Sequence, residues 1–229
     1  MKPIIDAPSP NCDERAEPIS LVVLHYTGME SGKEALDRLT DAASKVSAHY
    51  LIEQDGQVYA LVPEEKRAWH AGLGGWGPHD NVNQVSIGIE LVNRGHFWGY
   101  EEFPEAQMTA LEDLLAGMMQ RHGLKPHQVV GHSDIAPERK EDPGEKFPWD
   151  RFAAKGLTLG TYQGGADGPL PDCVEAIEML AEIGYRVTPT HPVAATLAFQ
   201  RRFCPQDLGQ GLSPLTRAAI SAVAGRLRV

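Results

Sequence analysis

The hydrophobic pattern predicts a strand that is buried on both faces near the N-terminus and a strand of alternating character further on. Residues 20–26 read SLVVLHY, with four consecutive apolar residues, as in a strand that is covered on both sides. In residues 86–91 the apolar Ile87, Ile89 and Leu91 share one face, which leaves Ser86, Gly88 and Glu90 on the other. The second strand is therefore expected to have one core face and one polar face.

Helices and a hairpin are predicted between and after these strands. Ser31 and Glu34 have the spacing of a helix N-terminal capping box, and residues 104–122 carry an apolar stripe that stops at Gly123. Residues 47–62 predict two strands joined at Asp55-Gly56 by a type I′ turn. Interleaved helices and strands with a hairpin predict an α/β (α+β) fold, with a mixed central sheet flanked by helices.

The pattern changes after residue 149. Residues 161–171 are turn-rich and predict a linker between a domain at 1–160 and a small three-helix domain at 172–229. The three amphipathic segments are expected at about 172–183, 192–203 and 213–227. Some 60 residues form only a small core, so we expect this module to dock on the first.

Composition narrows the classes of partner. The chain has 229 residues, 42% hydrophobic and 23% charged, with a net charge of −10, which disfavours nucleic acid and anionic membranes. No apolar run approaches the roughly 20 residues of a membrane span. Three scattered cysteines and the lack of an export signal at the N-terminus predict a cytoplasmic protein, or a periplasmic one if a signal has been removed. We expect a monomer.

Two histidines close predicted strands and suggest a metal site. His25 ends the first strand and His132 ends the VVGH strand, so both emerge at one edge of the sheet. The loop that follows offers Glu138, Glu141 and Asp142 as a third ligand. Two imidazoles and one carboxylate suit a catalytic zinc ion. Taken alone, a histidine at a strand end is more often a hydrogen-bonded structural residue, and this alternative stays open.

Five motifs, in order, carry a family resemblance: LHYTG, SAHYLIEQDGQVYALV, RAWHAG, SIGIELVN and GHSDIAPERKEDPGEKFPW. They resemble the zinc-dependent N-acetylmuramoyl-L-alanine amidases of the type-2 amidase family, in its AmpD/AmiD branch, over roughly residues 8–155. The tail LAFQRRFCP…GLSPLTRAAI is similar to a small helical peptidoglycan-binding domain, with a looser signature.

The resemblance implies roles for five residues. His25, His132 and Asp142 fall where the family holds Zn²⁺, and Glu90 and Lys140 fall on its catalytic glutamate and lysine. Amide hydrolysis requires an activated water and a protonated leaving amine, and zinc lowers the pKa of a bound water to about 7. Glu90 would move the proton. Lys140 would stabilise the negative charge that develops on the carbonyl oxygen.

Further residues are weaker candidates for substrate binding. His49 is expected to line the site or to orient a ligand, and His70 to contact substrate. Trp76 would meet a sugar or anchor a lid, while Asn93 and Arg94 would hold a peptide carboxylate. The remaining histidines are expected to be structural or exposed: His79, His96, His122, His127 and His191.

The resemblance predicts hydrolysis of the amide between N-acetylmuramic acid, or its 1,6-anhydro form, and L-alanine of the stem peptide, with muropeptides or peptidoglycan fragments as partners. We expect cytoplasmic recycling of muropeptides. An envelope amidase that acts on intact wall, which the tail favours, and a non-catalytic peptidoglycan-recognition protein are the alternatives.

Overall fold

A mixed sheet of six strands forms the centre of the protein. The structure, a computed structural model, describes residues 2–187 and 192–228, so His191 lies outside the described residues. The strand order is β1-β5-β4-β7-β3-β8. The bounds are β1 Ile5–Asp6, β3 Leu21–Tyr26, β4 Tyr50–Ile52, β5 Val58–Ala60, β7 Ser86–Leu91 and β8 Val129–Gly131. A separate antiparallel pair joins β2 (Cys12–Glu14) to β6 (Lys66–Ala68).

The strands that lead to the candidate site run in one direction. β3 pairs in parallel with β7 on one side and β8 on the other, and β4 is parallel to β7. β3 is buried along its apolar run because both faces of the sheet are covered there. This mixed sheet with flanking helices confirms the predicted fold class.

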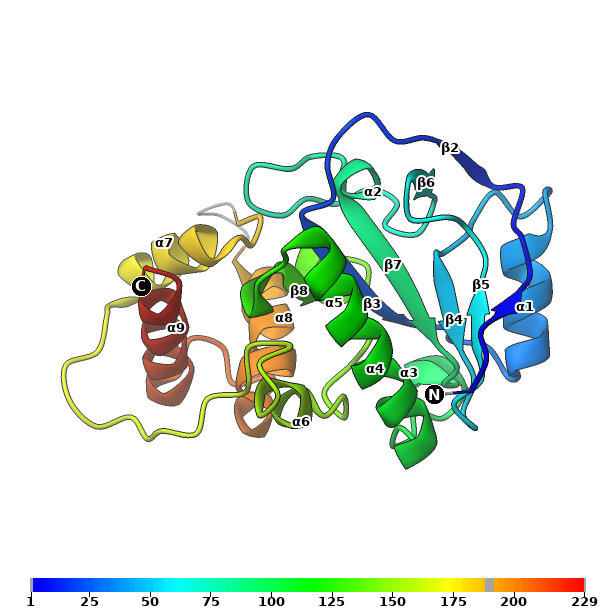
Figure 1. Cartoon of the computed structure of the whole chain (residues 1–229). Coiled ribbons are helices and arrows are strands. Elements are labelled where there is room, and N and C mark those ends of the chain that lie inside the picture. The colour runs from blue at the N-terminus through cyan, green and yellow to red at the C-terminus, as the bar shows by residue number, and fades with distance from the viewer. Residues whose placement is uncertain (1, 188–191, 229) are drawn as a thin grey trace.

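Helix α4 (Glu105–His122) covers one face of the sheet (Figure 1). Its stripe of Met108, Leu111, Leu115 and Met118 is buried against Ile87, Ile89 and Leu91 of β7, among others. The helix starts after Pro104 and ends at Gly123, whose φ of +64° is the left-handed conformation that glycine adopts at helix ends. The predicted helix and its apolar stripe are confirmed.

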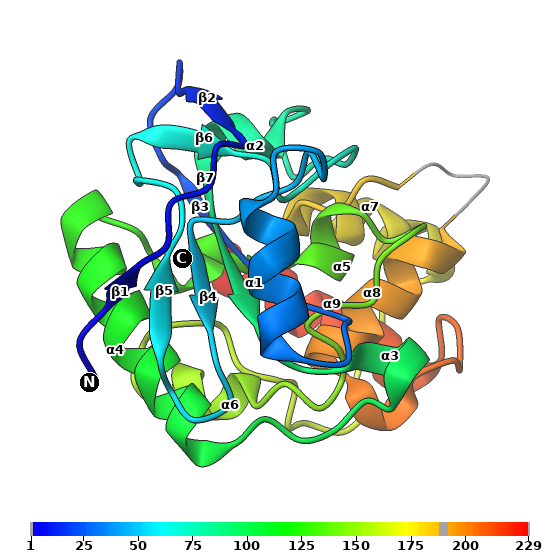
Figure 2. The same ribbon diagram turned by 90° about the vertical axis from the view of Figure 1, so that its right-hand side faces the viewer.

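The opposite face is shared by two sets of helices (Figure 2). α1 (Gly32–Thr40) packs over β4, and its N-terminus is capped by the Ser31 side chain, which accepts a hydrogen bond from the Glu34 backbone N–H. The C-terminal helices and α5 (His132–Ile135) pack over β3 and β8. Short helices complete the chain: α2 Val82–Val85, α3 Gly95–Trp98 and α6 Trp149–Ala153, with 3₁₀ turns at Pro126–Gln128 and Pro205–Asp207.

The hairpin forms as expected, but the type of its turn was predicted wrongly. β4 and β5 are antiparallel, and the Gly56 backbone N–H donates to the Glu53 carbonyl. A type I′ turn needs positive φ at both Asp55 and Gly56. Gly56 has φ +81°, whereas Lys45 is the one described non-glycine residue with positive φ. The extra loop residues let Asp55 avoid the left-handed region that an L side chain disfavours.

Three helices form the C-terminal part: α7 Cys173–Ile183, α8 Val193–Phe203 and α9 Pro214–Leu227. Their buried side chains, such as Leu180 and Phe199, belong to one hydrophobic cluster with Val23 of β3 and Val130 of β8. The helices are therefore packed directly on the sheet. The domain boundaries at 160 and 172 stay a prediction. No helix in the described ranges is long and apolar enough to cross a membrane.

Candidate active site

Three potential metal ligands meet at the carboxyl ends of β3 and β8. Nδ1 of His25 lies 2.8 Å from Nδ1 of His132, and Oδ2 of Asp142 lies 3.2 Å and 3.0 Å from these two nitrogens. All three side chains are buried. Within the described ranges, they are the one cluster of three or more histidine, cysteine or acidic side chains whose ligand atoms lie close enough to hold a metal ion. The Asp142–Pro143 peptide bond is cis.

Strand register explains why distant residues meet here. His25 on β3 is the register partner of Glu90 on β7, and Leu24 is the partner of Gly131 on β8. His132 directly follows Gly131 and therefore emerges beside His25. Asp142 returns to the same point because its carbonyl accepts a hydrogen bond from the Ser133 backbone N–H at 2.8 Å.

The protonation states suit a metal ion. Burial lowers the pKa of His25 to about 4, and the charge of His132 acts in the same direction, so the His25 imidazole is neutral at pH 7. Burial alone would raise the pKa of Asp142. The charges of His132 and His25 and their hydrogen bonds outweigh it and hold that pKa well below its usual range. A neutral His25 imidazole and an ionised Asp142 carboxylate suit the donor set of a zinc site.

Hydrogen bonds behind the two histidines orient them. Nε2 of His132 lies 3.1 Å from the Ala71 carbonyl, and Nε2 of His25 lies 3.0 Å from Nδ1 of His70. Nε2 of His70 is 3.2 Å from Ser86 Oγ, which donates to the Val82 carbonyl. A ligand role for Nδ1 of His25 leaves the proton on Nε2, so the imidazole donates to His70. Such partners behind a metal ligand fix its tautomer and ring orientation.

Glu90 and Lys140 line the same cleft as His132 and Asp142. Oε2 of Glu90 is shielded from solvent and has no hydrogen-bond partner among the described residues. Burial raises the pKa of Glu90 well above its ordinary value, the charge of Asp142 adds to the rise, and Lys140 opposes it. Buried polar atoms without partners are rare in folded proteins, and they point to a reacting group or a ligand.

His49 lies behind the cleft rather than on its wall. The side chain is fully buried, and Nδ1 accepts a hydrogen bond from the Gly88 backbone N–H at 3.0 Å. Nε2 lies 3.1 Å from the Lys66 carbonyl. Burial lowers the pKa of His49 to about 3, and the nearby Arg15 charge also lowers it. His49 is therefore a neutral, buried histidine that connects β7 to β6 through these two contacts.

Three other candidates for substrate binding also lie off the cleft lining. Trp76 packs edge-on against Tyr185 of the C-terminal part, with ring centroids 4.9 Å apart. Asn93 is fully buried and donates to the Glu101 carbonyl at 2.9 Å, which holds the loop after β7. Arg94 is exposed. Of the five weaker candidates, His70 is the one that borders the cleft.

The cleft wall contains residues that the sequence did not single out. Arg38 of α1 borders the cleft, and its guanidinium has no partner in the described part of the chain. Ser86 does not line the cleft but lies behind it and contacts His70. The alternation of β7 had placed Ser86 on the polar face of that strand, and this was the signal in the sequence that could have identified it. Among the carboxylates offered as third ligand, Glu138 and Glu141 are exposed, whereas Asp142 is buried beside the histidines.

Comparison with known proteins agrees with the fold. The family model of N-acetylmuramoyl-L-alanine amidases (Amidase_2) matches residues 15–145. AmiD of Escherichia coli K12 is 37% identical over 213 residues, which cover 82% of this chain and 75% of AmiD. The 1,6-anhydro-N-acetylmuramyl-L-alanine amidase AmpD of Citrobacter freundii is 36% identical over 64% of this chain and 87% of its own.

Solved structures extend the similarity to the C-terminal helices. AmiD of E. coli in complex with the substrate anhydro-N-acetylmuramic acid-L-Ala-D-gamma-Glu-L-Lys matches with a TM-score of 0.81, over 93% of this chain and 92% of that one. AmpDh3 of Pseudomonas aeruginosa matches with a TM-score of 0.84 and 32% identity, over 93% of this chain and 94% of its own.

The fold, together with the family match over residues 15–145, defines the class of this protein as a peptidoglycan amidase. The chain belongs to the N-acetylmuramoyl-L-alanine amidase family, in the AmpD/AmiD branch. The family resemblance that the five motifs indicated is thereby confirmed.

Proposed function

We propose that this protein is a zinc-dependent amidase that cleaves the bond between 1,6-anhydro-N-acetylmuramic acid and L-alanine of the stem peptide. The observation that carries the proposal is the convergence of three buried ligand atoms in the cleft that also holds Glu90, whose Oε2 atom has no hydrogen-bond partner among the described residues. Relatives named for this reaction support the substrate class.

His25, His132 and Asp142 would hold the zinc ion. A bound zinc ion would act as a Lewis acid and would lower the pKa of a water molecule enough for it to lose a proton near neutral pH. Because burial keeps the His25 imidazole neutral at pH 7, this ligand does not have to lose a proton before it binds the metal.

Glu90 would move the proton. A carboxylate with a raised pKa is a stronger base than an exposed one and keeps the proton that it accepts from water. The same oxygen can then deliver that proton to the nitrogen of L-alanine, which leaves as an amine. The unpartnered Oε2 atom is free to do both.

Lys140 would stabilise the negative charge that develops on the carbonyl oxygen. Its side chain borders the cleft and forms no hydrogen bond or ion pair within the described ranges. A fixed positive charge in a partly dry cleft is worth more than one in water. Arg38 also lines the cleft, likewise forms no side-chain hydrogen bond or ion pair with the described residues, and would suit a carboxylate of the stem peptide.

The reaction is tested directly by incubating zinc-loaded protein with anhydromuramyl-L-Ala-D-γ-Glu-L-Lys and identifying the fragments by mass spectrometry. Free tripeptide and anhydro-N-acetylmuramic acid are expected. Cleavage at another bond, or full activity after exhaustive chelation with no transition metal left, would overturn the proposal.

The ligand set is tested by Asp142→Ala. We expect loss of bound zinc and of hydrolysis, because the remaining two imidazoles leave the site one ligand short. Elemental analysis after dialysis measures the metal, and Glu138→Ala is the matched control, since that carboxylate is exposed and on the same loop. Equal zinc content in the Asp142 variant and the wild type would remove Asp142 from the ligand set.

The biological setting stays a prediction. A cytoplasmic recycling enzyme would turn over soluble anhydro-muropeptides faster than intact sacculi, whereas an envelope amidase would show the reverse. The similarity of the tail to a peptidoglycan-binding domain favours the second setting. Fractionation of tagged full-length protein, with both substrates assayed in parallel, decides between them.

A further inference from the structure

Two consecutive arginines of the C-terminal helix α8 contact the segment that carries two of the proposed metal ligands. This segment, residues 132–145, is called the ligand loop here. Arg202 reaches its start, at Asp134, and Arg201 reaches its end, at Glu141 and Glu145. The family match ends at residue 145, so these contacts come from outside the matched region.

The contact at the start of the ligand loop is fully buried. Nη1 of Arg202 donates to Oδ2 of Asp134 at 2.6 Å, and Nη2 donates to the Val129 carbonyl at 2.8 Å. Oδ1 of Asp134 accepts from the Tyr185 hydroxyl at 2.6 Å, and Oδ2 also accepts from the Gly131 backbone N–H. Asp134 lies two residues after His132. The C-terminal part therefore fixes, from two sides, the turn from which His132 projects.

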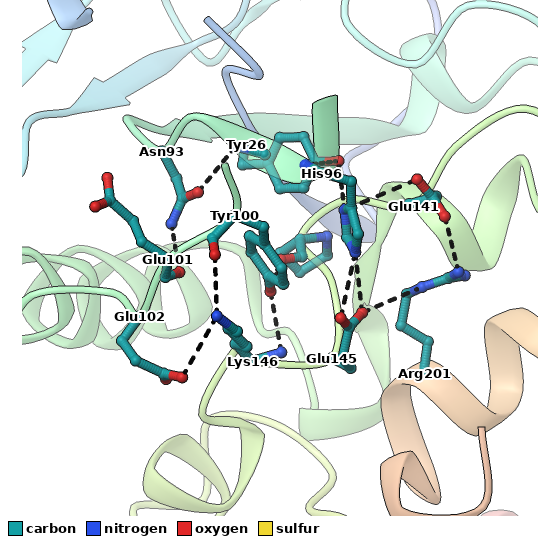
Figure 3. Close-up of polar contacts among 12 residues, drawn as sticks. Tyr26, Asn93, His96, Tyr100, Glu101, Glu102, Glu141, Glu145, Lys146 and Arg201 are labelled. Atoms are coloured by element: carbon teal, nitrogen blue, oxygen red, sulfur yellow. Dashed lines mark hydrogen bonds and ion pairs between the residues drawn. The ribbon is translucent and has the colours of Figure 1, made fainter. Parts of the chain in front are cut away.

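The contact at the end of the ligand loop is a charge cluster (Figure 3). Nη2 of Arg201 lies 3.2 Å from Oε1 of Glu141, and its Nε lies 3.6 Å from Oε2 of Glu145. Glu141 stands between Lys140 and Asp142 in the chain. The Arg201 side chain is 11% exposed, so solvent screens this cation only weakly. Arg201 therefore contacts two carboxylates at the end of the ligand loop with one guanidinium group.

The same cluster extends to the third ligand. Nε2 of His96 lies 3.1 Å from Oε2 of Glu145, and Nδ1 of His96 lies 2.9 Å from the hydroxyl of Tyr26, the residue after His25 (Figure 3). Each proposed metal ligand thus has a near neighbour in the chain that is held by one of two groups of contacts: Asp134 by Arg202, and Glu141 and Tyr26 by the cluster around Arg201, Glu145 and His96. α8 is the element of the C-terminal part that supplies both arginines.

From these contacts we infer that Arg201 and Arg202 are positioning residues, through which the C-terminal helices hold the ligand loop in its metal-binding conformation. This inference rests on the proposed function, because it takes His132 and Asp142 as ligands. The C-terminal helices are then part of the catalytic unit, whatever affinity for glycan they have.

The test uses the full chain with Arg201→Gln, which removes the charge at a site that reaches the surface, and Arg201→Lys, which keeps it. Arg228→Gln is the matched control: it removes an ion pair with Glu182 within the same helical part, away from the ligand loop. We expect peptides spanning residues 138–147 of metal-free Arg201→Gln to exchange amide hydrogens about 10-fold faster than wild type. Arg201→Lys is expected to restore part of the protection, and Arg228→Gln to match wild type.

Zinc affinity and steady-state kinetics give independent readouts. Loss of a residue that orients metal ligands weakens zinc binding or activity by about 10- to 100-fold, so kcat should fall in Arg201→Gln while KM stays near the wild-type value. A purely structural role predicts a lower melting temperature with unchanged loop exchange and zinc affinity, and that result would overturn the inference. Failure of the wild type to bind zinc would instead refute the proposed function, while hydrogen exchange would still report on the loop.

Arg202 is tested through a milder change, because its removal would take the only arginine contact from the fully buried Asp134 side chain among the described residues and leave a cavity beside it. Arg202→Lys keeps the charge but cannot reach both Asp134 and the Val129 carbonyl with one planar group. We expect faster exchange in peptides covering residues 130–136 and a changed visible absorption spectrum of the Co²⁺-substituted protein, which reports ligand geometry. Wild-type exchange and an identical Co²⁺ spectrum would overturn the inference for Arg202.

Discussion

The two faces of strand β7 differ in what they are built to do. On one face Ile87, Ile89 and Leu91 are fully buried against α4, in a cluster of apolar side chains. On the other face Ser86 and Gly88 contact histidines, and Oε2 of Glu90 has no hydrogen-bond partner in the part of the chain that the structure describes. The same six residues therefore contribute to the hydrophobic core on one side of the sheet, called the apolar face, and to the candidate active site on the other, called the chemical face. The β7 side chains on the first face are all apolar, whereas the second face buries several polar groups.

Glu90→Gln should have the largest effect on the chemical face. The amide keeps the shape of the side chain but cannot accept the proton, so hydrolysis should fall by about 100- to 10,000-fold. Zinc content and the free energy of unfolding should stay near the wild-type values. Hydrolysis of anhydromuramyl peptide is the measurement, and hydrolysis at the wild-type rate would exclude Glu90 from proton transfer.

Leu111→Ala tests the apolar face. Leu111 is fully buried in α4, and truncation leaves a cavity, so the free energy of unfolding should fall by about 2–5 kcal/mol. Chemical denaturation measures the loss. Zinc content and kcat per folded molecule should stay unchanged, because the site lies across the sheet. A large fall in kcat without loss of stability would show that the two faces are not separable in this way.

Gly88→Ala should disturb the chemical face through the histidines. A Cβ built on Gly88 would overlap the imidazole of His70, which supports His25. We expect zinc affinity to weaken by about 10- to 100-fold as His70 is displaced. Gly225→Ala in α9 is the control, since open space surrounds that position and alanine favours helix. Competition with a chromophoric chelator measures affinity, and equal affinity in the two variants would contradict the expectation.

The smallest effect is a dependence of stability on pH from His49. Its folded pKa of about 3 lies below the unfolded value of 6.5, so the unfolded chain binds more protons between these values. Stability should be complete above pH 6.5 and fall as pH decreases, by about 1.4 kcal/mol at pH 5.5. Urea denaturation of metal-free protein at pH 7.5 and 5.5 measures this. Between pH 7.5 and 5.5, the free energy of unfolding of His49→Gln should fall by about 1.4 kcal/mol less than that of the wild type. An equal fall in both proteins would show that His49 does not contribute to the pH dependence.

Most of the fold was predictable because local patterns and tertiary packing agree. The buried run of β3, the alternation of β7 and the stripe of α4 each report which faces are covered. The turn at Asp55-Gly56 was predicted wrongly because a dipeptide preference does not fix loop length. Whether Trp76 and Asn93 face the substrate could not be predicted, since their neighbours, Tyr185 and Glu101, depend on how other segments pack.

The amino-acid sequence by itself determined the periodicities, the helix ends and the motifs that carry the family. These are properties of residues close together in the chain, where spacing alone decides which side chains share a face. The family resemblance already singled out Asp142 among the three carboxylates of its loop. Tertiary structure decided that this side chain is buried beside the histidines while Glu138 and Glu141 are exposed, and that α8 reaches both ends of the ligand loop. Such contacts join residues 10 to 117 positions apart, and only the register of parallel strands and the packing of helices on them bring those side chains together.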